Sequence, residues 1–360
     1  MKIDPMKRLV LSILALSCAF VAIGCAKNES GSPSSSGSSS AARTKLQGSG
    51  ASFPAPLYLR WFKDYEKKSS TVYVDYQAKG SGAGIQDLVN ETVDFAASDA
   101  AMTPEEIAKV KNGVVMLPMT AGKVVLAYNL PSGPAELKLS REAYCKILMG
   151  EITKWNDPVI AACNSGVTLP DVAITVVVRS DSSGTTHVLS THLSAVNPQW
   201  KEKYGINKTI NWPNVSHLVK APKNDGVMAL IKQTPGAIGY VEYGFALQTK
   251  QTVATLENQS GSYVKPTTQT GQAALASVSE VPEDLVVWIA DPVGADCYPI
   301  VSYTWLLCYQ KYSDPAKLKA VHNLVDYCVG EGQAISESIG YIPLPPSMIE
   351  KVRAATAKIQ

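Results

Sequence analysis

Short apolar runs alternate with segments of helical spacing along most of this chain. The run Ile174–Val178 reads ITVVV, and every residue in it is apolar or β-branched. Consecutive residues of this kind are typical of a strand that is buried on both faces of a sheet. Apolar residues at helical spacing follow at 184–196. Such alternation favours a layered α/β fold, and a length of 360 residues suggests about two domains.

The same alternation is found on both sides of this unit. Tyr128–Pro131 has the composition of an exit from a first domain, and the polar interval 256–283 is expected to be irregular. Strands are predicted at 71–77, 93–99, 122–131, 173–179 and 300–309, and helices at 57–65, 84–91, 103–112, 140–150, 184–196 and 315–332.

The N-terminus has the pattern of an export signal. Three basic residues precede an apolar stretch, 9–24, which is shorter and more polar than the about 20 residues of a membrane-spanning helix. If translation started at Met6, Lys7 and Arg8 would still provide the basic segment that an export signal needs. The stretch ends in VAIGC, which resembles a bacterial lipobox. We therefore expect residues 1–24 to be a signal peptide and Cys25 to carry lipid, palmitate included. A plain secretory signal is the alternative.

The next segment, 25–44, predicts a flexible tether. Eight of the fourteen residues 29–42 are Ser, and such a sequence cannot bury apolar surface. The expected product is an exported protein anchored to a membrane and facing the periplasm or the cell exterior. The net charge of +2 arises within the first 24 residues, so the remainder is close to neutral. A basic nucleic-acid-binding surface is therefore not indicated.

Five cysteines follow the tether, at positions 145, 163, 297, 308 and 328. Disulfides are permitted outside the cytoplasm, and an odd number leaves at least one thiol unpaired. We expect Cys145 to pair with Cys163 and favour a second pair, Cys308 with Cys328. The sequence has no CxxC motif and no Cys/His cluster, so it indicates neither a zinc site nor a metal cofactor.

Three loops share small or hydroxyl residues with glycine and lead into predicted helices: 48–53 (GSGASF), 80–84 (GSGAG) and 182–186 (SSGTT). The first amides of a helix are unpaired and carry partial positive charge, so such loops are natural anion sites. A single loop is weak support, because most are ordinary caps. Three of them, together with Arg179 at a strand end, favour an anion site more strongly.

Two enzymatic interpretations of the third loop do not fit known motifs. A nucleophile elbow requires Gly-x-Ser-x-Gly, which neither Ser182 nor Ser183 satisfies. A phosphate-binding P-loop requires a Lys after its last glycine, and Gly184 is followed by Thr. The sequence therefore argues against an enzyme of either kind. An ordinary strand–turn–helix connection stays open, with Arg179 paired to Asp181 at the surface.

Several motifs together resemble those of the phosphate-binding proteins of bacterial phosphate-specific ABC transporters, the PstS family. They are GSGASFPAPLY (48–58), GSGAG (80–84), TVDFAASDA (92–100), KWNDP (154–158), RSDSSGTT (179–186), NDGV (224–227) and PGAIGYVEY (235–243). The resemblance implies a class II periplasmic-binding-protein fold of two hinge-linked α/β domains. It places domain I at 45–128 and 297–360, domain II at 129–296, and the ligand in the cleft between them.

The resemblance also implies the residues that bind phosphate. In the family, the first loop supplies a hydroxyl and a backbone amide, the second supplies a hydroxyl, and an aspartate accepts a hydrogen bond. Ser52 stands where Thr is common, and Ser182 where Gly is common. The matching positions here are Ser52, Phe53, Ser81, Asp99, Arg179, Asp181, Ser183, Gly184 and Thr185.

The chemistry of these residues suits a protonated oxyanion. A carboxylate such as Asp99 only accepts hydrogen bonds, so it can bind the proton of phosphate but is left unpaired against sulfate. Mismatches of this kind can discriminate by about 10⁴-fold. We expect a monomeric, non-enzymatic lipoprotein that delivers phosphate to an ABC permease. A phosphate or oxyanion sensor or scavenger of the same fold, and a secreted phosphate-ester hydrolase, are the alternatives.

Overall fold

The computed structural model describes residues 43–134 and 136–360. The predicted signal peptide, the lipidated Cys25 and the tether as far as residue 42 lie outside the described residues. Within the described ranges, no helix is both long enough and apolar enough to cross a membrane.

The strands belong to two sheets. The larger sheet has the order β2-β1-β3-β11-β4-β8-β6-β7, and the smaller has the order β10-β9-β5. The strands are β1 (Thr44–Gly50), β2 (Val72–Ala78), β3 (Phe95–Ser98), β4 (Val114–Tyr128), β5 (Lys138–Leu139), β6 (Thr175–Arg179), β7 (Leu218–Ala221), β8 (Ala237–Glu242), β9 (Thr255–Glu257), β10 (Tyr263–Val264) and β11 (Val301–Tyr309).

The helices alternate with these strands. They are α1 (Ala55–Lys68), α2 (Ser81–Val89), α3 (Pro104–Ile107), α4 (Arg141–Leu148), α5 (Pro158–Ala162), α6 (Gly184–Val196), α7 (Pro198–Lys203), α8 (Lys223–Gln233), α9 (Tyr243–Gln248), α10 (Thr268–Ala276), α11 (Pro315–Val329) and α12 (Pro346–Thr356), with 3-10 helices at Glu331–Ile335 and Glu337–Ile339.

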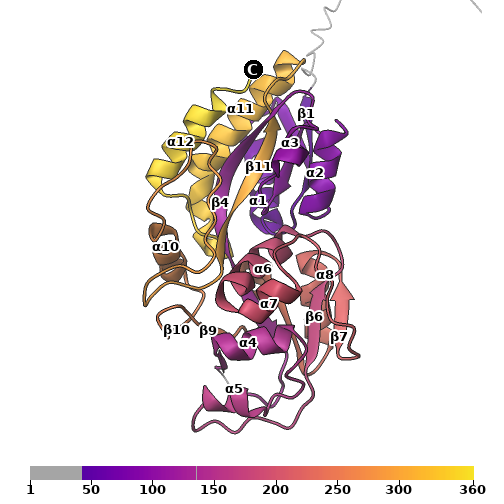
Figure 1. The fold of residues 1–360 in the computed structure, drawn as a ribbon. Helices are drawn as coiled ribbons and strands as arrows, with labels where there is room; N and C mark the ends of the chain where they lie inside the picture. Colours follow the sequence, from indigo (N-terminus) through magenta and orange to yellow (C-terminus); the bar gives the residue numbers. More distant parts are fainter. Residues whose placement is uncertain (1–42, 135) are drawn as a thin grey trace, which may run out of the picture. The chain divides into compact units, whose positions relative to one another are not determined.

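The long strand β4 connects two halves of the larger sheet. Its residues 114–123 pair antiparallel with β11, and its residues 124–128 pair antiparallel with β8. Around β11 lie β1, β2 and β3, whereas β8 leads to the parallel pair β6 and β7. Figure 1 shows α11 and α12 beside this first group of strands, so both ends of the described chain build one half. The result is a mixed α/β fold with two domains.

The apolar pattern accounts for most of these elements. The predicted strand at 173–179 is confirmed as β6, in which the four residues 176–179 are all buried. The predicted helix at 184–196 is confirmed as α6. The helix predicted at 103–112 begins after Thr103, which forms a capping box with Glu106, but it ends at Ile107. The interval 256–283 was wrongly predicted to be irregular, because it contains β10, α10 and most of β9.

The predicted disulfides are wrong. All five cysteines of the described residues carry free thiols. Cys145 is buried in α4 beside Asn197, whereas the Cys163 thiol donates to the Ile160 carbonyl at 3.2 Å. Closeness in sequence did not make the two thiols face each other. Cys308 on β11 and Cys328 on α11 are both buried in the core as ordinary apolar side chains.

Candidate functional site

The first hydroxyl loop lies between β1 and α1. Gly50 has φ 138°, and a Cβ there would lie 2.1 Å from the Ala97 carbonyl oxygen, so only glycine fits this turn. The chain then places Ser52 and Phe53 directly before the helix, and both are buried. The Phe53 carbonyl accepts a hydrogen bond from the Tyr341 hydroxyl at 2.6 Å. The loop is therefore held at Gly50 by its close packing against Ala97 and at Phe53 by the hydrogen bond from Tyr341.

The second loop places a serine next to an aspartate. Ser81 is the first residue of α2, and its Oγ lies 3.3 Å from the Asp99 amide nitrogen and 3.5 Å from Asp99 Oδ2. Asp99 follows β3, and its Oδ1 accepts from the Thr304 hydroxyl at 2.9 Å. Both Ser81 and Asp99 are buried. Two side chains that are 18 residues apart in sequence thus form one polar cluster.

Burial changes the acid strength of this aspartate. Removal from water raises the pKa of Asp99 to about 7, while the Thr304 hydrogen bond, the Arg179 charge and the Ser81 hydrogen bond act in the opposite direction. A carboxylate in a low-dielectric site prefers its neutral form, because the charged form loses its hydration. Asp99 therefore changes between hydrogen-bond donor and acceptor near neutral pH.

The third loop begins where β6 ends on Arg179. The guanidinium donates to both carboxylate oxygens of Asp181, from Nε at 2.8 Å and from Nη2 at 2.6 Å. A third bond of 3.3 Å joins Nη1 to Thr185 Oγ1. The pairing with Asp181 considered from the sequence is therefore present, but the Arg179 side chain is 1% exposed, so its expected place at the surface is wrong. Two of the five guanidinium N–H groups have no partner in these contacts.

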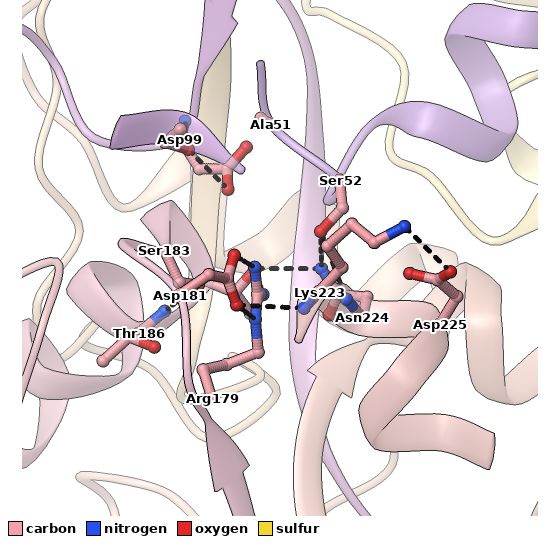
Figure 2. Close-up of polar contacts among 12 residues, drawn as sticks. Ala51, Ser52, Asp99, Arg179, Asp181, Ser183, Thr186, Lys223, Asn224 and Asp225 are labelled. Atoms are coloured by element: carbon pink, nitrogen blue, oxygen red, sulfur yellow. Dashed lines mark hydrogen bonds and ion pairs between the residues drawn. The ribbon is translucent and has the colours of Figure 1, made fainter. Parts of the chain in front are cut away.

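The ion pair also affects Asp181. Partial burial acts to raise its pKa, but the Arg179 hydrogen bond and charge outweigh this effect and lower the pKa. The backbone amide of Lys223 adds a hydrogen bond of 2.9 Å to Asp181 Oδ1. Asp181 is therefore held as a carboxylate that orients the guanidinium (Figure 2).

The N-terminus of α6 faces the first two loops. Ser183 caps this helix by accepting from the Thr186 amide at 3.0 Å. A Cβ on Gly184 would lie 2.4 Å from Ser81 Oγ and 2.5 Å from Asp99 Oδ2. The backbone also meets across this contact, since the Gly82 amide donates to the Ser182 carbonyl at 3.1 Å. The structure therefore brings Ser81 and Asp99 directly against the unpaired first-turn amides of α6.

Asn224, at the start of α8, is a central residue of the cluster that the sequence pattern does not single out. Its Nδ2 donates to Ser52 Oγ at 3.0 Å and to Thr185 Oγ1 at 3.1 Å. Ser52 is thereby joined to the third loop, as Figure 2 shows for Ser52 and Asn224. The NDGV motif at 224–227 was the available signal, but neither composition nor spacing assigns it a role. The neighbouring Lys223 has φ 58°, a strained value for a residue with a side chain.

Two buried titratable residues, Lys123 and Glu242, lie where β4 meets β8. Burial raises the pKa of Glu242 to about 8 and lowers the pKa of Lys123 to about 8. Lys123 Nζ donates to the Gly340 carbonyl at 3.0 Å, and Glu242 Oε2 accepts from the Gly244 amide at 2.7 Å. The Glu242 amide donates to Asn224 Oδ1 at 2.9 Å. One direct hydrogen bond therefore connects the junction of β4 and β8 to the cluster.

Among the predicted residues, the structure brings many donors close to one buried acceptor. The donors are the spare N–H groups of Arg179, the amides at the start of α6 and the hydroxyls of the three loops. The acceptor is Asp99, which faces the same helix start. A tetrahedral oxyanion that carries a proton matches this arrangement. The described residues contain no group of three or more His, Cys, Asp or Glu that could hold a metal ion.

Comparisons with known proteins give a consistent result. A model of the PBP superfamily domain matches residues 35–330. The chain is 37% identical to the phosphate-binding protein PstS of Pasteurella multocida, over 86% of this chain and 89% of the relative. It is 34% identical to the phosphate-binding protein PstS of Methanocaldococcus jannaschii, over 95% of this chain and 93% of the relative.

Solved structures support the fold. A high-affinity periplasmic phosphate-binding protein, PfluDING, bound with phosphate, matches with a TM-score of 0.72 at 22% identity, over 86% of this chain and 93% of that chain. A phosphate-binding protein from Stenotrophomonas maltophilia matches with a TM-score of 0.68 at 22% identity, over 87% and 94% of the two chains.

Proposed function

Because the chain belongs to the PstS family of phosphate-binding proteins, within the PBP superfamily, we propose that it captures inorganic phosphate outside the cytoplasm. In this proposal it then delivers phosphate to the permease of an ABC transporter. The arrangement of Asp99 is the observation that carries the proposal. This buried carboxyl group lies against the α6 N-terminus, where a bound anion would meet both donors and one acceptor.

The proposed phosphate ligands are the residues expected from the sequence. Arg179 offers its two spare N–H groups to two oxygens, and Asp181 orients it. Backbone amides of the first and third loops surround the anion. The proposed donors and supports are Ser52, Phe53, Ser81, Arg179, Asp181, Ser183, Gly184 and Thr185, with Asp99 accepting the phosphate proton.

Phosphate would lie between two domains, for which we propose the boundaries 45–128 with 297–360, and 129–296. Ser81 and Asp99 belong to the first of these, and Gly184 to the second. Close approach of the two sides at Gly184 supports binding by closure of the cleft. We propose a binding role without catalysis, in which Ser183 caps α6 and offers its hydroxyl hydrogen to phosphate. We also propose that the exported protein is a monomer held at the membrane by lipid on Cys25.

Calorimetry with phosphate and sulfate tests this function. At about pH 8, where Asp99 is mainly ionised, we expect saturable phosphate binding and no measurable sulfate binding. The reason is that sulfate has no proton for the carboxylate. Equal affinity for both anions would contradict the proposed selectivity. Absence of phosphate binding would contradict the function itself.

A further inference from the structure

Both side-chain donors of Asn224 are already used within the protein, so this residue has no side-chain hydrogen left to offer an anion. Its two amide hydrogens go to Ser52 Oγ and Thr185 Oγ1, and its Oδ1 accepts from the Glu242 backbone amide. The Glu242 N–H can only donate, so it fixes which end of the amide is oxygen and which is nitrogen. Nδ2 must therefore face the two hydroxyls.

The hydroxyl oxygen of Ser52 has no acceptor capacity left. A serine or threonine hydroxyl has one hydrogen to donate and two lone pairs that accept. Ser52 Oγ accepts from both the backbone amide and Nδ2 of Asn224, at 3.2 and 3.0 Å. Its only remaining interaction is donation of its own hydrogen.

The hydroxyl oxygen of Thr185 also has no acceptor capacity left, because it accepts from a different pair of donors. Its Oγ1 accepts from Arg179 Nη1 at 3.3 Å and from Asn224 Nδ2 at 3.1 Å. Within residues 43–134 and 136–360, the structure gives neither the Ser52 nor the Thr185 hydroxyl an acceptor. Both hydrogens are thus available to an oxyanion at the cluster.

We propose that Asn224 is a positioning residue that turns Ser52 and Thr185 into obligate hydrogen-bond donors, so that both hydroxyl hydrogens are held for oxygens of the bound anion. This inference rests on the proposed phosphate site and deepens it. Asn224 acts without touching the ligand. It also joins a hydroxyl from the first loop to one from the third, so both are fixed only when the two sides meet.

A double-mutant cycle tests the proposal, with phosphate affinity measured by calorimetry. We expect Asn224→Ala to weaken phosphate binding by roughly 10-fold or more, since hydrogen bonds to charged groups are among the stronger ones. In a background that already carries Ser52→Ala and Thr185→Val, the same substitution should change affinity by less than about twofold. A general packing role would produce the same loss in both backgrounds, and that result would overturn the proposal.

Asn129→Ala is the matched control. The Asn129 amide donates to the Ile231 and Lys232 carbonyls near the far end of α8. This variant is expected to lower the unfolding midpoint while keeping phosphate affinity within about twofold of the unaltered protein. A loss of affinity equal to that of Asn224→Ala would overturn the proposal, because it would show that any disturbance of α8 weakens phosphate binding.

Asn224→Asp provides a second test if the alanine variant does not fold. The carboxylate keeps the acceptor for the Glu242 amide but cannot donate, so both hydroxyls would turn their hydrogens toward it. We expect phosphate affinity at about pH 8 to fall at least as far as in Asn224→Ala. Affinity equal to that of the unaltered protein would overturn the inference alone. No phosphate binding by the unaltered protein would overturn the proposed function as well.

Discussion

In the proposed function, Asp99 is the residue on which discrimination between protonated and fully ionised oxyanions depends. Burial raises its pKa to about 7, so the group is a carboxylate acceptor above neutral pH and a carboxylic acid donor below it. The acid can donate to sulfate, whereas the carboxylate repels it. Rejection of sulfate should therefore be strong at about pH 8 and should weaken as the pH falls through about 7.

Asp99→Asn reproduces the neutral form at every pH. We expect it to weaken phosphate binding by roughly 10- to 100-fold at about pH 8, through loss of a charged hydrogen bond. Measurable sulfate binding should appear at about pH 8 and change little at about pH 5.5. Calorimetry with both anions at the two pH values checks this. Asp94→Asn is the control, because that buried carboxylate binds the Gln47 amide and Lys317. Unchanged selectivity in Asp99→Asn would refute the role.

The N-terminus of α6 lies directly against Ser81 and Asp99 of the other proposed domain. Gly184→Ala would place a methyl group within 2.4 Å of Ser81 Oγ and 2.5 Å of Asp99 Oδ2. In the proposed function, the added methyl group would meet Ser81 and Asp99 only when the two proposed domains close on each other. We therefore expect phosphate affinity to fall by roughly 10- to 100-fold, the usual consequence of overpacking by about 1–3 kcal/mol, with little change in the unfolding midpoint.

Gly226→Ala in α8 is the control for this glycine. Its new methyl group would lie 3.2 Å from the Pro222 ring, and alanine favours a helix over glycine. The control should bind phosphate normally and unfold at the same or a slightly higher denaturant concentration. If Gly184→Ala also bound phosphate normally, the close approach at this helix would not be part of the bound state.

Elements with a regular pattern could be predicted from the sequence, whereas contacts between distant elements could not. The α6 bounds follow from apolar spacing and the Ser183 cap. The pairing of Asp99 with Thr304 could not be predicted, because they are 205 residues apart and β11 is uniformly buried. Family resemblance supplied the ligand set. The role of Asn224 appears only once its hydrogen bonds are seen.

At the scale of the whole described chain, closure of the two proposed domains can be followed through Trp288. This side chain is 43% exposed, whereas the other five tryptophans are buried. Its ring lies 4.8 Å from His187 on α6 and 5.7 Å from Trp305 on β11. By the proposed boundaries, His187 and Trp305 belong to different domains. Opening of the cleft must therefore separate Trp288 from at least one of them.

Phosphate should thus shift the tryptophan emission of the protein to shorter wavelength, as Trp288 passes from a wetter to a drier environment. Trp288→Phe should remove most of this shift and leave calorimetric affinity within about threefold, because an exposed ring contributes little binding energy. Trp212→Phe, at a buried position within one proposed domain, should keep the shift. Phosphate binding with no emission change in the unaltered protein would mean that the cleft does not close on its ligand, and a shift that survives Trp288→Phe would place the movement elsewhere.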